Sequence, residues 1–174
     1  VWKINKTEID NHILNYNNTG YIIPDAIDSW PAHGDTTLGQ AFNLAPFIDA
    51  DNNGLYDASL GDYPDIKGDQ ALYIIRNDIG NIHTETDAEQ MGIEQYLMFY
   101  GYANPCPAIN HALFVNMKIF NRGNYNLNDF YAGTWLDSDL GFYMDDYIGC
   151  NVGKNLGYTY NGDAEDEGAN GYSN

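Results

Sequence analysis

The stretch GIEQYLMFYGYA, residues 92–103, decides the fold together with HALFVNMKIFNRG, residues 111–123. In both, the alternate residues are mostly apolar; they are Ile93, Gln95, Leu97 and Phe99 in the first stretch and Leu113, Val115, Met117 and Ile119 in the second. Successive side chains of a strand point to opposite faces, so this period of two predicts two strands that turn these residues to a core. The NPCPAIN segment between them suits an antiparallel connection.

Three further segments carry strand signals. ALYIIRND, residues 71–78, is an apolar run bounded by turn residues, which predicts a buried strand. FYAGTWLD, residues 130–137, and LGYTYNG, residues 156–162, are the other candidates. We therefore expect a mostly β chain folded as an antiparallel β-sandwich, jelly-roll-like, with long ordered loops.

Helical signals are confined to the first 30 residues. TEID, residues 7–10, is a capping-box pattern with Thr7 as the N-cap, and Ile9 and Ile13 follow at the i, i+4 spacing of one helix face. Further on, Pro24 suits the first turn of a second short helix that ends before Pro31.

The chain is also divided by composition. Residues 1–69 are rich in helix and turn signals, and residues 70–174 carry the predicted strands. We expect the first segment to pack on the β-sandwich of the second, so that both belong to one domain of a longer protein.

The charge of the chain restricts its partners. Twenty-five Asp and Glu residues oppose seven Lys and Arg residues, which gives a formal net charge of −18. Phosphate backbones and anionic lipids would be repelled, so nucleic acids and membranes are disfavoured as partners. No apolar run reaches the roughly 18 residues that a membrane-spanning helix needs. Metal cations and neutral ligands such as glycans are the partners that this charge permits.

DADNNGLYD, residues 49–57, is the strongest candidate for a binding site. Calcium takes about six to eight oxygen ligands, and calcium loops supply them from side chains at positions 1, 3 and 5, with a Gly at 6 and a carbonyl at 7. The matching residues are Asp49, Asp51, Asn53, Gly54 and Leu55. Asp57 takes position 9. Leu60 at position 12 offers no side-chain oxygen, so either Asp62 or another part of the chain completes the set of ligands. The alternative is a solvated loop of Asx turns without an ion.

A second acidic segment is WLDSDLGFYMDDYIGCN, residues 135–151. Asp137 and Asp139 would share one face of a strand, and Asp145 and Asp146 follow within reach. Calcium and ordinary turn capping by surface acids are equally good interpretations of this segment. A third run, Asp163, Glu165, Asp166 and Glu167, indicates a solvated loop.

No catalytic or cofactor-binding residue is assigned. The acids are too numerous for sequence to select a glycosidase pair, whose separation is a property of three dimensions. Nucleophile, phosphate-loop and dinucleotide motifs do not occur. Whether the chain is an enzyme stays open, and a non-catalytic module is favoured. The alternative is a carbohydrate-binding or glycoside-hydrolase-associated domain, which requires an exposed Trp30 or Trp135 beside carboxylates.

The succession of motifs along the chain resembles a module common in large secreted proteins of Bacteroidota, which typically end in a type IX secretion sorting domain. The motifs are WPAHGD (30–35), APFIDADNNGLYD (45–57), GDYPDIKGDQALYIIRND (61–78), HTET (83–86), GIEQ (92–95), GTWLDSDLGFYMDDYIGC (133–150) and YNGDAEDE (160–167). The loop at 49–57 also resembles the D-x-D-x-N-G-x-x-D loops of dockerins and thrombospondin type 3 repeats, which bind calcium outside cells.

The resemblance implies a secreted or cell-surface location. It places eight residues at motif positions expected to hold calcium: Asp49, Asp51, Asn53, Asp57, Asp137, Asp139, Asp145 and Asp146. An oxidising compartment would favour a disulfide between Cys106 and Cys150, and two buried free thiols are the alternative. The expected function is a calcium-stabilised structural or adhesive module, with further copies or domains of a surface assembly, or glycans, as partners.

Overall fold

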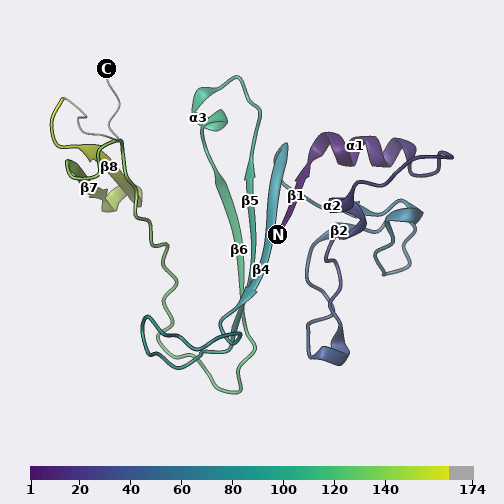
Figure 1. Cartoon of the computed structure of the whole chain (residues 1–174), viewed down its shortest axis with the longest axis horizontal. Coiled ribbons are helices and arrows are strands. Elements are labelled where there is room, and N and C mark those ends of the chain that lie inside the picture. The colour runs from purple at the N-terminus through teal and green to yellow at the C-terminus, as the bar shows by residue number, and fades with distance from the viewer. Residues whose placement is uncertain (165–174) are drawn as a thin grey trace. The chain divides into compact units, whose positions relative to one another are not determined.

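The computed structural model describes residues 1–164. They divide into two compact units, residues 1–128 (unit 1) and the described residues from 129 onward (unit 2). Glu165, Asp166 and Glu167 of the third acidic run lie outside the described residues. Unit 1 is built on a four-stranded antiparallel sheet, ordered β1-β4-β5-β6 (Figure 1). Its strands are β1 (Trp2–Asn5), β4 (Gln70–Asn77), β5 (Ile93–Gly101) and β6 (Phe114–Asn121).

The remaining elements are short. Those of unit 1 are α1 (Lys6–Asn15), α2 (Asp25–Asp28), η1 (Thr36–Leu38), β2 (Phe47–Ile48), η2 (Ala58–Leu60), β3 (Tyr63–Pro64) and α3 (Pro107–Asn110). Strands β2 and β3 pair antiparallel. Unit 2 contains β7 (Asp146–Asn151), η3 (Val152–Lys154) and β8 (Leu156–Asn161), with β7 and β8 paired antiparallel. The chain is mostly β, with antiparallel sheets and few short helices.

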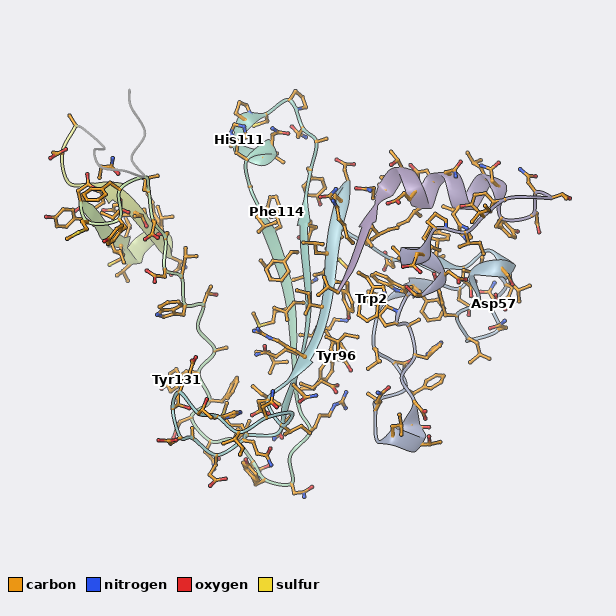
Figure 2. The ribbon with its side chains drawn as sticks, in the orientation of Figure 1. Trp2, Asp57, Tyr96, His111, Phe114 and Tyr131 are labelled. Atoms are coloured by element: carbon orange, nitrogen blue, oxygen red, sulfur yellow. The ribbon has the colours of Figure 1, made fainter. Side chains whose placement is uncertain are left out.

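The two strands predicted from residues 92–103 and 111–123 are confirmed, and the prediction of their core face holds only in part. The sheet buries the opposite face, which carries Tyr73, Tyr96 and Met98, at 3%, 4% and 5% exposure (Figure 2 labels Tyr96). On the face that sequence assigned to the core, Ile93 and Leu97 of β5 are buried, whereas Val115 and Met117 of β6 are 48% and 41% exposed. Both faces are apolar, so the period of two cannot say which one the rest of the chain covers.

The core face is covered by the segment between β1 and β4. Ile27 of α2 is fully buried, and Trp30 packs on Tyr73 with ring centroids 5.2 Å apart. Trp30 also donates a hydrogen bond from Nε1 to the carbonyl of Pro46, at 2.9 Å. Since a Trp ring buries a large apolar area and its N–H has a partner, this residue anchors the segment on the sheet.

The N-cap of helix α1 lies two residues before the predicted one. It is Asn5, and the Glu8 carboxylate accepts hydrogen bonds from the backbone and side-chain N–H groups of Asn5. The capping interaction therefore uses Asn5 and Glu8 instead of Thr7. The buried stripe of α1 is Ile9 and His12, whereas Ile13 is 40% exposed, so the predicted pairing of Ile9 with Ile13 was wrong.

Other predictions had mixed outcomes. Helix α2 forms as expected, with Pro24 as its N-cap rather than in its first turn, and β4 and β8 correspond to two of the predicted strand segments. The strand predicted at 130–137 is not formed, and β7 was missed because its residues were interpreted as an acidic cluster. No closed sandwich or jelly roll is formed by the described residues, so that part of the architecture stays a prediction.

Cys106 and Cys150 are free thiols in this structure, and both are exposed rather than buried as the alternative to the disulfide predicted. Cys106 belongs to unit 1 and Cys150 to unit 2. Within residues 1–164, no helix has the length and apolar character needed to cross a membrane.

Candidate metal centre

The loop at 49–57 folds around its own carboxylates. Asp49 accepts a hydrogen bond from the Gly54 N–H at 2.8 Å, and both Asp49 and Asp51 accept from the Asn53 N–H at 3.2 Å. Gly54 has φ +82°, a left-handed conformation that Gly adopts without steric cost. The backbone thus turns its donors toward Asp49 and Asp51 and holds both carboxylates on the inner side of the loop.

Asp62 ties the two ends of this loop together. Its carboxylate is fully buried and accepts hydrogen bonds from the N–H groups of Ala50 and Asp57, each at 2.8 Å. A buried carboxylate is costly unless hydrogen bonds and an opposite charge compensate it. Among residues 1–164 the ion pairs join Lys6 to Asp10 and Arg122 to Glu94, so no basic side chain neutralises Asp62.

Asp49, Asp51 and Asp62 form a cluster that could hold a metal ion. One carboxylate oxygen from each lies within 4.8 Å of the others. Three negative charges at this separation repel each other, and a divalent cation between them would reverse the sign of that interaction. Since all donors are oxygens, the cluster suits hard cations and offers none of the nitrogen or sulfur ligands that zinc prefers.

The other predicted ligands of the loop have local roles. Asp57 is the N-cap of η2, where its Oδ1 accepts from the N–H and hydroxyl of Ser59 at 2.8 and 2.6 Å (Figure 2 labels Asp57). These hydrogen bonds lower the pKa of Asp57. Asn53 accepts from the N–H of Leu55 at 2.7 Å. The structure therefore groups Asp62, rather than Asp57, with Asp49 and Asp51.

Hydrogen bonding also holds Asp49 in its charged form. The N–H of Gly54 is the largest contribution that lowers the pKa of Asp49. A backbone donor stabilises the carboxylate and not the neutral acid, so Asp49 is available as an anionic ligand at neutral pH.

His12 adjoins the cluster and was missed by sequence reasoning. Its ring is fully buried, with Nε2 3.1 Å from the carbonyl oxygen of Asp62 and Nδ1 without a hydrogen-bond partner among the described residues. Burial lowers the pKa of His12. The one available signal was its i, i+3 spacing from Ile9, which places both residues on one helix face.

We expect the stability of the chain to fall between pH 7.5 and pH 5.5 because of His12. A lowered folded-state pKa means that the unfolded state takes up the proton first, near its ordinary pKa of 6.5, so the stabilisation present above that pH is lost as pH falls toward the folded-state value. Urea unfolding at both pH values in chelator should show this loss. The variant His12→Gln should show a smaller difference between the two pH values, and an equal difference would contradict the assignment.

The second acidic segment lies in unit 2 and is only partly gathered. Asp137 and Asp139 are exposed in a stretch without regular structure, and Asp145 precedes β7. Asp146 accepts from the N–H of Leu140 at 2.7 Å through Oδ2. Its cross-strand neighbour is Asn161, and the buried Oδ1 atoms of both have no hydrogen-bond partner among the described residues. Sequence reasoning missed Asn161, because only the β7–β8 register brings it to Asp146.

Of the two tryptophans considered for carbohydrate binding, only Trp135 is exposed. Trp30 is 4% exposed and belongs to the core of unit 1, whereas Trp135 of unit 2 is 84% exposed. The possibility that Trp30 stacks on a sugar ring is therefore excluded by its burial.

Comparison with known proteins adds no family or fold assignment. No family model, curated protein or solved structure matches this chain. The resemblance to secreted Bacteroidota modules accordingly stays a prediction, and the cluster of Asp49, Asp51 and Asp62 is the feature on which function can be argued.

Proposed function

We propose that this chain is a non-catalytic, calcium-stabilised extracellular module with a structural or adhesive role in a secreted bacterial surface protein. One observation carries the proposal: the loop carboxylates of Asp49 and Asp51 converge on the buried carboxylate of Asp62, within 4.8 Å. Such a convergence is costly in a chain of net charge −18 unless a cation compensates it.

Calcium fits this cluster better than other common cations. It accepts irregular sets of carboxylate, amide and carbonyl oxygens at about 2.3–2.6 Å, whereas Mg²⁺ demands near-ideal octahedral geometry and retains its waters. Asn53, Leu55 and Asp57 lie in the same loop and can add further oxygens after small rearrangements. The D-x-D-x-N-G-x-x-D pattern of residues 49–57 supports the same choice.

The extracellular location is supported by the type of site. Only two of its three acids, Asp49 and Asp51, come from one loop, and Asp51 is exposed, so we expect a weak site. Extracellular calcium modules bind with dissociation constants of about 10⁻⁴–10⁻³ M, in contrast to the about 10⁻⁹–10⁻⁸ M of cytosolic buffers. The proposal includes attachment to a larger surface assembly and the oxidising compartment implied by the sequence resemblance.

The proposed structural role rests on the position of the ion, which would lie where Asp62 holds the two ends of the loop together. Asp62 bonds to residues 50 and 57 at the two ends of the loop, and the loop lies in the segment that covers the sheet. An ion there would stiffen the segment that covers the sheet.

The proposal also includes the β-sandwich, whose second sheet would lie on the face carrying Leu72, Leu97 and Met117. The strand residues of this face include no Asp or Glu.

Direct titration tests the proposal. Chelator-treated protein titrated with calcium in a calorimeter should show binding with a dissociation constant of about 10⁻⁴–10⁻³ M, and magnesium should bind more weakly. Asp49→Asn should weaken the binding in unit 1, whereas Asp35→Asn, which changes the Asx cap of η1, should leave it unchanged. Absence of calcium binding would overturn the proposal, and nanomolar binding would overturn the extracellular assignment.

A further inference from the structure

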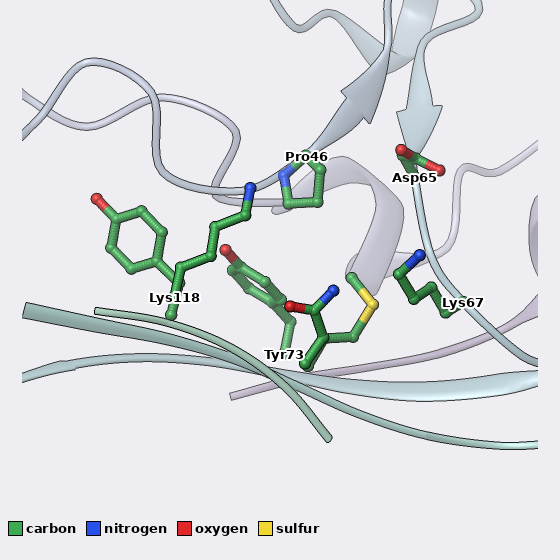
Figure 3. Close-up of a pocket in the computed structure, with 8 residues that line it drawn as sticks. Pro46, Asp65, Lys67, Tyr73 and Lys118 are labelled. Carbon is green, nitrogen blue, oxygen red and sulfur yellow. The ribbon is translucent and has the colours of Figure 1, made fainter. Parts of the chain in front are cut away.

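A pocket of about 240 Å³ lies between the core face of the sheet and the segment that covers it. Its sheet side is formed by Tyr73 of β4, Tyr96 and Met98 of β5, and Asn116 and Lys118 of β6. On the covering side, Lys67 belongs to the connection between β3 and β4. In the close-up, Tyr73 lies between Lys118 and Lys67 (Figure 3).

The floor of this pocket is apolar, and its polar atoms are already paired. Tyr73 donates from its hydroxyl to the Leu44 carbonyl at 2.8 Å, and Tyr96 donates to the Glu94 carboxylate at 2.6 Å. With these hydroxyl groups engaged, the two rings and the Met98 side chain offer apolar surface. A ligand that covers this floor therefore needs an apolar body.

The rim has the opposite charge to the chain as a whole. Lys67 and Lys118 are two of only seven basic residues among 25 acidic ones, and neither forms an ion pair with a described carboxylate. Asp65 also lines the rim, which leaves a local charge of +1. At physiological ionic strength charges beyond about 8 Å are largely screened, so the rim decides which small ion the pocket attracts.

We propose that this pocket binds a small organic carboxylate. The apolar body of the ligand lies on Tyr73, Tyr96 and Met98, and its carboxylate lies between Lys67 and Lys118, with the Asn116 amide as a further donor. A single negative charge matches the rim charge of +1, which favours a monoanion over a phosphate ester. Aromatic acids and acidic sugars share this chemistry. The inference stands independently of the calcium site, whose residues do not line the pocket.

The chain contains a suitable reporter for binding. Of its four methionines only Met98 lines the pocket, whereas Met91, Met117 and Met144 lie elsewhere. With ¹³C-methyl-labelled methionine, benzoate should shift the Met98 signal with a dissociation constant of about millimolar size and leave the other three in place. Benzamide has the same ring without the charge and should bind more weakly. Glucuronate, compared with glucose, tests the acidic sugars in the same way.

Variants of the rim residues distinguish the contribution of the rim charge to binding from the contribution of the cavity itself. The double variant Lys67→Gln and Lys118→Gln should raise the dissociation constant of benzoate about tenfold, at the strength of exposed ion pairs. Lys3→Gln with Lys154→Gln removes two lysines outside the pocket and should leave it unchanged. Asn116→Asp, which adds a carboxylate to the rim, should also weaken binding.

The titrations distinguish an aromatic acid from an acidic sugar as the ligand, and they can also overturn the proposal. A Met98 shift with benzoate alone supports an aromatic acid as the ligand, and a shift with glucuronate supports an acidic sugar. A Met98 signal that moves with neither anion overturns the proposal. Equal binding of benzamide and benzoate, or an unchanged dissociation constant in the double lysine variant, overturns it as well.

Discussion

Calcium at 100 times its dissociation constant should raise the free energy of unfolding of this chain by about 2.7 kcal/mol. The increase follows from linkage, because only the folded state brings Asp49, Asp51 and Asp62 within 4.8 Å of one another. Each further tenfold in free calcium should add about 1.4 kcal/mol. Thermal unfolding with excess chelator, and then with calcium restored, measures this increase as a rise of several degrees in the midpoint.

Asp51→Asn should remove most of this response. Asp51 is exposed and keeps its shape as Asn, so the variant removes a charge from the cluster without opening a cavity. Asp35→Asn is the matched control, since it should respond to calcium like the parent. An unchanged midpoint in the parent would contradict the linkage. An equal response in Asp51→Asn would assign the ion to the second acidic segment, Asp137–Asp146.

Trp30→Ala should destabilise unit 1 by about 3–5 kcal/mol, the usual cost of removing a large buried aromatic side chain. The ring is 4% exposed, packs on Tyr73 and donates a hydrogen bond to Pro46. Its removal leaves a cavity between the sheet and its covering segment, whereas the Pro46 carbonyl keeps the hydrogen bond that it accepts from the Asp65 N–H at 3.1 Å. Urea unfolding followed by circular dichroism measures the loss.

Trp135→Ala provides the same chemical change on an exposed residue. Trp135 is 84% exposed, so its truncation should change the free energy of unfolding by less than about 0.5 kcal/mol. Similar losses in the two variants would show that Trp30 is not the anchor of the core. A loss in Trp30→Ala that Trp30→Phe largely restores would attribute the effect to packing rather than to the hydrogen bond.

Signals carried by neighbouring residues were predictable from sequence. The antiparallel strands at 93–101 and 114–121 follow from alternation, and the short helix after Pro24 follows from its fixed φ. The inward turn of Asp49 and Asp51 also follows from local chemistry, because Asx side chains accept hydrogen bonds from N–H groups shortly after them.

Features that depend on distant residues were not predictable in the same way. Which face of β5 packs into the core cluster depends on where the segment with Trp30 lies, and the alternation is equally regular on both faces. Asp57 and Asp62 are both acids near the loop. Only the η2 turn makes Asp57 an N-cap and Asp62 the buried carboxylate that accepts from the Asp57 N–H. Asn161 meets Asp146 through a strand register that no local pattern specifies.

The pairing of β1 with β4 also sets a time scale for folding. Asn5 and Gln70 are cross-strand neighbours and hydrogen-bond partners 65 residues apart in the chain. At a synthesis rate of roughly 5–20 residues per second, about 3–13 seconds pass between the synthesis of β1 and the synthesis of its partner strand. Helix α1 needs only local contacts and can form within that interval, whereas the sheet cannot. The four-stranded sheet therefore cannot be completed before β4 has been synthesised, and a chain that is cut before β4 leaves β1 without a partner strand.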